Sequence, residues 1–240
     1  MPATPELYSF IAKWEGGLSQ DGNTNKGIKW STFQKKAGTV LGLQPTRDNF
    51  NNLTQDQQQL FIDSFWLDSG VSRLRSQGIA DFLLDWYWMA PSSSMAYTAA
   101  ALNDTFGVTA ASNKPTDVVD AINRIPNQQA VLTALKAARA QMQADLIVQD
   151  STYQQYATGW NNRLNDAYNT FAPYTGTVLN SSAPAAKQSS LLPAWLPPWA
   201  GYGAAALLFA AFVYEVSQPN KPKRPLYYLS GTKRRKKKSK

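Results

Sequence analysis

One stretch near the amino terminus combines residue types that could perform acid–base chemistry. Glu15 stands between Trp14 and the pair Gly16-Gly17, and Asp21 follows six positions later. A carboxylic acid can protonate the oxygen of a glycosidic bond, while a second carboxylate activates water or stabilises the positive charge that develops on the sugar. The glycines remove side chains where a sugar would approach the backbone. The stretch therefore suggests a site for cleaving a saccharide, with Asp21 and Thr24 facing Glu15 across it.

The same residues have a plainer interpretation. A general acid needs an environment that keeps it protonated near neutral pH, and Trp14 with an apolar helix face would supply one. Glu6 is the only other glutamate in residues 1–180. In the alternative interpretation, Glu15 merely ends a helix and the glycines form a turn. The stretch alone leaves both open.

The composition excludes several classes of site. The chain of 240 residues contains no His and no Cys. This excludes Ser-His-Asp and Cys-His nucleophiles, disulfides, and zinc sites built on imidazole or thiolate. Proton transfers at neutral pH must then use carboxylates, Tyr or Lys. We expect no metal and no cofactor.

The positive charge of the chain is concentrated at its carboxyl end. The formal net charge is +8, yet residues 1–180 hold 13 Lys/Arg and 15 Asp/Glu, whereas residues 221–240 hold ten Lys/Arg and no acidic residue. The basic character therefore belongs to the tail and says nothing about what the body binds.

The apolar periodicity predicts a mainly α body. Thr4-Pro5 can cap and start a helix whose apolar positions (Leu7, Phe10, Ile11, Trp14) share one face, so Glu15 sits at its carboxyl edge. Further helices are expected from Ser31, Thr54 (with Gln57 as a capping box), Gln77 to Met89, Ser92–Ser94, Thr116, Asn127 and Ser151. The stretch 42–52 is rich in turn residues, and a small hairpin is expected between Leu18 and Lys29.

The chain is also rich in aromatic residues, which either fill a core or stack on sugar rings. We assign Trp66, Phe82 and Trp160 to the core. Tyr87, Trp88 and Tyr97 are left open between the two roles.

The last third of the chain changes character. Residues 173–194 are rich in Pro, Ala and Ser and are predicted to be a linker. Residues 195–216 are predicted to be a single transmembrane anchor, because Trp199 to Tyr214 carry no charge and aromatic residues stand at both edges. The alternative is a helix buried against the body. Residues 217–240 form a basic tail suited to anionic lipid or, alternatively, nucleic acid.

These features predict a topology. If the basic tail stays inside, the body lies on the opposite side of a virion or host inner membrane. The first residues show no basic region followed by an apolar run, so no cleavable secretory signal is expected.

The motifs resemble those of the glycoside hydrolase 108 family of N-acetylmuramidases, common in bacteriophage endolysins. The specific part is Glu15-Gly16-Gly17-Leu18-Ser19 followed by Asp21-Gly22-Asn23-Thr24-Asn25-Lys26-Gly27-Ile28, and Phe61–Trp66, Ile79–Asp85, Thr98–Val108 and Gly159–Arg163 continue the similarity in order. Leu18 stands where the family has Tyr, and the acidic loop is shorter by several residues.

The resemblance implies a lysozyme-like helical fold with at most a small β-hairpin. Residues 1–90 would be the catalytic part and 91–172 a helical remainder like the family's peptidoglycan-binding region. Glu15 would be the catalytic acid, with Asp21 and Thr24 as further catalytic residues. Substrate contacts would come from Gly16, Gly17, Asn25, Gly27 and Trp88.

The function expected from this is cleavage of the bond between N-acetylmuramic acid and N-acetylglucosamine, as a lysozyme or as a lytic transglycosylase. With the anchor, it suggests a phage enzyme that opens the wall at entry or exit, with virion proteins as possible partners. The alternative is a non-catalytic, membrane-anchored wall-binding or virion protein that has kept the fold.

Overall fold

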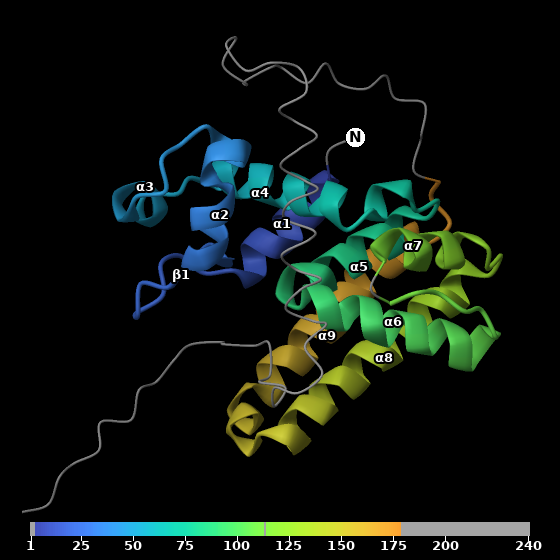
Figure 1. The fold of residues 1–240 in the computed structure, drawn as a ribbon. Coiled ribbons are helices and arrows are strands. Elements are labelled where there is room, and N and C mark those ends of the chain that lie inside the picture. Colours follow the sequence, from blue (N-terminus) through green and yellow to red (C-terminus); the bar gives the residue numbers. More distant parts are fainter. Residues whose placement is uncertain (1–2, 113, 179–240) are drawn as a thin grey trace, which may run out of the picture. The chain divides into compact units, whose positions relative to one another are not determined.

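The computed structural model describes residues 3–112 and 114–178 (Figure 1). The described residues are mainly helical, with one two-stranded sheet, as predicted. The elements in chain order are α1 (Pro5–Trp14), β1 (Thr24–Asn25), β2 (Ile28–Lys29), α2 (Trp30–Leu41), α3 (Arg47–Asn51), α4 (Gln55–Asp68), η1 (Val71–Arg73), α5 (Gln77–Met89), α6 (Pro91–Phe106), α7 (Pro115–Asn123), α8 (Gln128–Gln149), η2 (Ser151–Tyr156), α9 (Ala157–Phe171) and η3 (Ala172–Tyr174), where η denotes a 3-10 helix.

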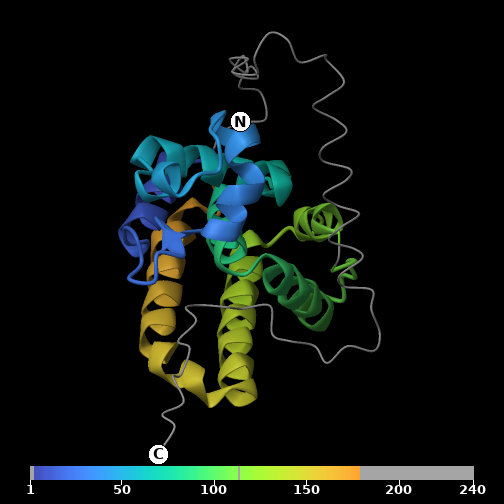
Figure 2. The ribbon, with the colours of Figure 1, turned by 60° about the vertical axis from the view of Figure 1, so that its left-hand side comes forward.

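Helix α5 is the centre of the packing. All its residues from Gly78 to Trp86 are buried, and it contacts α1, α4, α6, α8 and α9. At Gly78 the absence of a side chain is required, because a Cβ there would lie 2.3 Å from the carbonyl oxygen of Phe171. Helices α8 and α9 run side by side in opposite directions and extend away from the amino-terminal helices (Figure 2).

Three of the capping residues predicted from the sequence are confirmed. The hydroxyl of Thr4 accepts the N–H of Leu7, Thr54 and Gln57 form the capping box, and Asn127 caps α8. The predicted starts of α6 and α7 were late, because Pro91 and Pro115 occupy the first helical positions, where proline needs no N–H partner.

Other boundaries differ from the prediction. Helix α2 starts at Trp30 rather than after a Ser31 cap, and Ser151 opens the 3-10 helix η2 rather than α9. The turn-rich stretch 42–52 contains the short helix α3, which Thr46 caps by accepting the N–H of Asn49.

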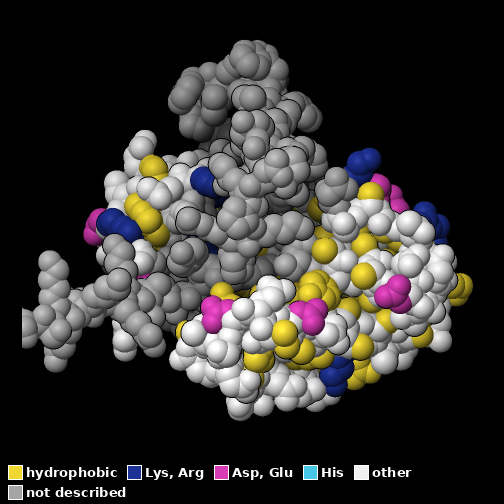
Figure 3. Space-filling view, turned by 60° about the horizontal axis from the view of Figure 1, so that its bottom comes forward, with side chains coloured by type: hydrophobic (Ala, Val, Ile, Leu, Met, Phe, Trp, Pro, Cys, Tyr) yellow, Lys and Arg dark blue, Asp and Glu magenta, His cyan; other side chains and the backbone are white. Residues whose placement is uncertain are grey.

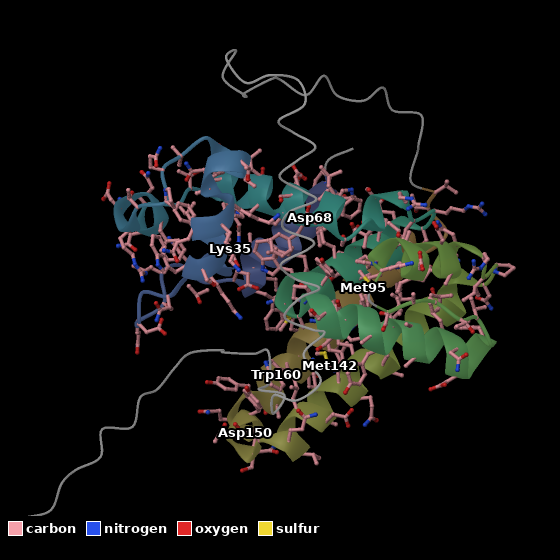
Figure 4. All side chains as sticks on the ribbon, viewed as in Figure 1. Lys35, Asp68, Met95, Met142, Asp150 and Trp160 are labelled. Atoms are coloured by element: carbon pink, nitrogen blue, oxygen red, sulfur yellow. The ribbon has the colours of Figure 1, made fainter. Side chains whose placement is uncertain are left out.

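Two of the three aromatic residues assigned to the core are there. Trp66 and Phe82 are fully buried. The assignment of Trp160 is wrong: it is half-buried and stacks on Tyr156 beyond the central packing, in the part of α9 near Met142 (Figure 4). The surface of this end carries few charged side chains, with apolar ones scattered among uncharged polar ones (Figure 3).

The described residues all belong to one compact unit. The division that we expected at residue 90 falls between α5 and α6 inside this unit. None of the described helices is long and apolar enough to cross a membrane. The segment predicted as an anchor, 195–216, the basic tail 217–240 and most of the linker lie outside the described residues.

A buried carboxyl group ties α1 to α5. Both oxygens of Asp81 accept the hydroxyl of Thr4 at 3.0 Å, and Asp81 is fully buried. Burial raises the pKa of Asp81 to about 7, against the opposing effect of its hydrogen bonds from Thr4 and Gln77. Asp81 is therefore mostly protonated in the folded protein at pH values where it is ionised in the unfolded chain.

We predict that Asp81→Asn removes a pH dependence of stability. Between pH 4 and pH 7 the folded protein keeps a proton on Asp81 that the unfolded chain has lost, so this group makes stability fall as pH rises. The asparagine variant should gain stability relative to the native protein across this range, by up to about 4 kcal/mol at pH 7. Urea unfolding at several pH values measures this, with Asp104→Asn at an exposed position as the control. Parallel curves for Asp81→Asn and the native protein would refute the assignment.

Candidate active site

Glu15 occupies the end of α1, as the sequence predicts. It is the C-cap, and its N–H donates to the carbonyl of Ile11 at 2.9 Å. Its side chain is 17% exposed. The indole N–H of the neighbouring Trp14 donates to Asp166 of α9 at 2.6 Å and makes no hydrogen bond to Glu15. The carboxylate is thus held at a fixed helix end and remains open to solvent.

A line of alternating charges leads from Glu15 into the interior. Nη1 of Arg163 donates to Oε1 of Glu15 at 2.7 Å, and Nη2 and Nε of the same guanidinium donate to Oδ1 of Asp85 at 2.7 and 3.2 Å. Nη1 of Arg139 donates to Oδ2 of Asp85 at 2.8 Å. Side-chain exposure falls from 17% at Glu15 to 7% at Arg163 and to 1% or less at Asp85 and Arg139. This charge chain joins α1, α5, α8 and α9.

The four charges of this charge chain compensate one another. Burial by itself would raise the pKa of Asp85, but the guanidiniums of Arg163 and Arg139 outweigh it and hold that pKa below the ordinary value. Burial lowers the pKa of Arg139, and Asp85 opposes that effect. Burial by itself would also lower the pKa of Arg163, but the carboxylates of Asp85 and Glu15 outweigh it and raise that pKa. Asp85 is therefore an ionised group that orients two arginines.

The hairpin that follows Glu15 has a tight two-residue loop. Asn25 pairs with Ile28, and the two residues between them, Lys26 (φ 49°) and Gly27 (φ 79°), both have left-handed backbone conformations. Such loops match the twist of antiparallel strands. The amide of Asn25 donates to the carbonyl of Phe50 at 2.6 Å, and the buried Gln58 donates to the carbonyl of Lys26 at 2.7 Å. These bonds fix the tip of the hairpin to α3 and α4.

The tip of the hairpin lies against the glutamate. A Cβ placed on Gly27 would be 2.6 Å from Cδ of Glu15 and 2.7 Å from Oε2. A side chain at this position would displace the Glu15 carboxylate, and the backbone conformation (φ 79°) also favours glycine. Arg163 on one side and Gly27 on the other therefore set the orientation of the Glu15 carboxylate.

A pocket of about 170 Å³ lies beside this contact. Its lining residues come from the hairpin and four helices: Gly27–Lys29, Thr32, Phe65, Trp88, Met89 and Pro91. Gly27 touches Glu15, and the sulfur of Met89 accepts Nη2 of Arg139 at 3.2 Å. The pocket thus borders the charge chain at two points.

Three of the residues predicted for the site come together. Glu15 contacts Gly27, and Gly27 and Trp88 line the same pocket. Trp88 was left open between core and sugar contact. It is 8% exposed and packs on Phe65 with ring centroids 5.0 Å apart, so it forms a wall of the pocket.

The other predicted residues have different positions. Asp21 is exposed and accepts hydrogen bonds from Ser19 and Asn23 of its own loop. These bonds lower the pKa of Asp21, and the bond from the Ser19 hydroxyl, at 2.6 Å, has the largest effect. Thr24 lies in β1, paired with Lys29. The side chain of Asn25 is buried and engaged in holding the hairpin.

The two glycines after Glu15 are exposed, and the space where side chains would stand is open. The carbonyl of Gly17 accepts the N–H of Lys26 at 3.4 Å. Their substrate-binding role stays a prediction.

Sequence reasoning assigned no role to Arg163, Asp85 and Arg139. The signal was present: Arg139 falls between Leu135, Ala138 and Met142 on the apolar face of α8, and Asp85 stands inside the most apolar helix of the body. Charged residues are almost never buried without a partner, so such positions indicate buried ion pairs. Which charges pair with which is a property of the fold.

Comparison with protein families gives a match for the first part of the chain. Residues 8–90 match the sequence model of the family described as Glycosyl hydrolase 108. This match supports that family and indicates a glycoside hydrolase. It includes Glu15, Asp85 and Trp88, whereas Arg139 and Arg163 lie beyond it. No curated protein and no solved structure matches the chain.

We predict that Arg163→Met destabilises the protein by about 3–5 kcal/mol, because it leaves Glu15 unpaired and Asp85 with a single arginine. Arg163→Lys should be intermediate, since one ammonium cannot reproduce the fork that reaches both carboxylates. Urea unfolding measures both. Arg73→Met breaks an ion pair with Asp120 whose two side chains are about half exposed, and should cost about 1 kcal/mol or less. Equal losses for Arg163→Met and Arg73→Met would contradict the buried charge chain.

Proposed function

We propose that this protein is a peptidoglycan-degrading glycosidase that cleaves the bond between N-acetylmuramic acid and N-acetylglucosamine, with Glu15 as the acid. The observation that carries the proposal is the setting of Glu15. Its carboxylate is fixed by Arg163 and Gly27, stays partly exposed, and stands next to a pocket with aromatic walls. The family match over residues 8–90 supports the same activity class.

We propose separate tasks for the two oxygens of Glu15. Oε1 accepts a hydrogen bond from Arg163, so in the protonated form of Glu15 the proton for the leaving sugar oxygen would be carried by Oε2, on the side of Gly27. As that proton departs, negative charge develops on the carboxylate. Arg163 is already oriented to stabilise it, and a charge-assisted bond needs no rearrangement at that moment.

The second catalytic group is a finer part of the proposal. Asp85 is fully buried and engaged by two arginines, so it acts on Glu15 through Arg163 and does not reach a substrate. Asp21, on its exposed loop, would activate water or stabilise the oxocarbenium ion, with Thr24 nearby in β1. Otherwise the substrate's own hydroxyl closes on the anomeric carbon, as in a lytic transglycosylase. Reducing product ends would indicate hydrolysis, and 1,6-anhydro ends transglycosylation.

The replacement Glu15→Gln should abolish the activity. A glutamine can still accept from Arg163 but cannot donate an acidic proton, so clearing of bacterial cell-wall suspensions should slow by about 100-fold or more. Glu6→Gln, which changes the only other glutamate of residues 1–180, is the matched control and should remain active. If Glu15→Gln clears the suspension as fast as the native protein, the alternative of a non-catalytic wall-binding or virion protein is favoured.

We further propose that residues 195–216 anchor the protein in a membrane and that the tail contacts anionic lipid. The support is the uncharged stretch Trp199–Tyr214, its aromatic edges and the ten basic residues of 221–240. This arrangement suits a phage enzyme in a virion membrane or at the host inner membrane, with the catalytic body opposite the tail.

A chain ending at residue 194 should therefore appear in the soluble fraction of expressing cells. A chain ending at residue 216 keeps the apolar stretch without the basic tail and should stay with the membrane pellet. Equal distribution of the two shortened chains would argue against the anchor. In that case the basic residues of the tail would be better explained by binding to nucleic acid than by contact with anionic lipid.

A further inference from the structure

The pocket beside Glu15 is lined by a cationic side chain, Lys29, that the proposed cleavage does not use. Lys29 ends β2, immediately precedes α2 and lines the pocket together with Thr32. It is half-buried, and burial lowers its pKa. None of the lining residues of this pocket is acidic.

Lys29, unlike Lys13 and Lys36, has no counter-ion among the described residues. Lys36 binds Ser64 and Asp68, and Lys13 binds Asp166 at 2.8 Å. No carboxylate of the described residues lies within ion-pair distance of Lys29, and none contributes to its pKa. A partly buried ammonium without a counter-ion is destabilising, and an anionic group entering the pocket would relieve that cost.

The start of α2, which lines the pocket through Lys29 and Thr32, favours an anion as well. Lys29 is the N-cap of α2 but makes no side-chain capping bond, and the first turn has no acidic residue, so the positive end of the helix dipole is uncompensated. Glu15, beyond Gly27, is already paired with Arg163.

The remaining walls are apolar. Phe65, Trp88, Met89 and Pro91 line them, and the rings of Phe65 and Trp88 pack against each other. A ligand that fits therefore carries a carboxylate on a short apolar arm, and a bare polar anion or a neutral sugar would leave either the walls or the ammonium unmatched.

We infer that this pocket binds the carboxylate-bearing side group of the glycan strand, with Lys29 as the residue that recognises the carboxylate. The inference rests on the proposed function and names a specificity for it: strands whose sugars carry an acidic substituent are preferred over plain N-acetylglucosamine polymers. The carboxylate comes from the lactyl ether of muramic acid or from the peptide attached to it.

Binding of soluble fragments to the full chain tests this without turnover. Titration calorimetry would use three probes: the disaccharide of N-acetylglucosamine and N-acetylmuramic acid with a free lactyl carboxylate, the same disaccharide bearing its peptide, and neutral chitobiose. Lys29→Met should weaken binding of an acidic probe about tenfold to a hundredfold, the usual worth of a hydrogen bond to a charged group, and leave chitobiose unchanged. Lys29→Arg should keep most of the affinity. The acidic probe that loses affinity identifies the source of the carboxylate.

Lys35→Met is the matched control, because Lys35 stands on α2 with an exposed side chain (Figure 4). It should bind all three probes like the native protein, and circular dichroism checks that each variant is folded. The inference is overturned if Lys29→Met binds the acidic probes normally, if it loses chitobiose equally, or if the native protein binds no acidic probe. These outcomes are separate from the Glu15→Gln result, so the specificity can fail while the proposed activity stands.

Discussion

The ion-paired line Arg139–Asp85–Arg163–Glu15 is the interaction on which the candidate site depends. Two guanidiniums and a carboxylate are buried here, which is unfavourable unless each charge meets a partner in good geometry. Asp85 pairs with both arginines, and Nη1 of Arg163 is left for Glu15. Glu15 is the one partly exposed member of this line, and Arg163, which holds it, is itself held by the buried Asp85. The Glu15 carboxylate is therefore fixed where solvent and substrate can reach it.

This arrangement makes the two halves of the described unit interdependent. Glu15 and the hairpin lie in the stretch that matches the glycosyl hydrolase family, while Arg163 and Arg139 come from α9 and α8 beyond it. Helices α8 and α9 are thus a structural part of the candidate site. Helix α5 mediates the dependence, because it carries Asp85 and packs against both sides.

The hairpin completes the site by a different kind of contact. Its tip is held by Asn25 and Gln58, and this places Gly27 against the carboxylate of Glu15. The same tip forms one wall of the pocket that contains Lys29 and Trp88. Orientation of the acid and the shape of the pocket therefore share one cause, and a change that moves the hairpin should affect both.

The sequence by itself determined the mainly helical class, the starts of α1, α4, α5 and α8, the hairpin and the position of Glu15 at a helix end, because periodicity, capping and turn residues act over a few neighbours. It could also have indicated buried charges, since Arg139 and Asp85 interrupt apolar faces. Only the tertiary structure decided that Arg163 meets Glu15 across 148 positions of sequence, that Gly27 touches that carboxylate, and that Lys29 stays unpaired among the described residues. Pairing of distant charges and exclusion of a side chain depend on how helices pack, and packing is a property of the whole fold.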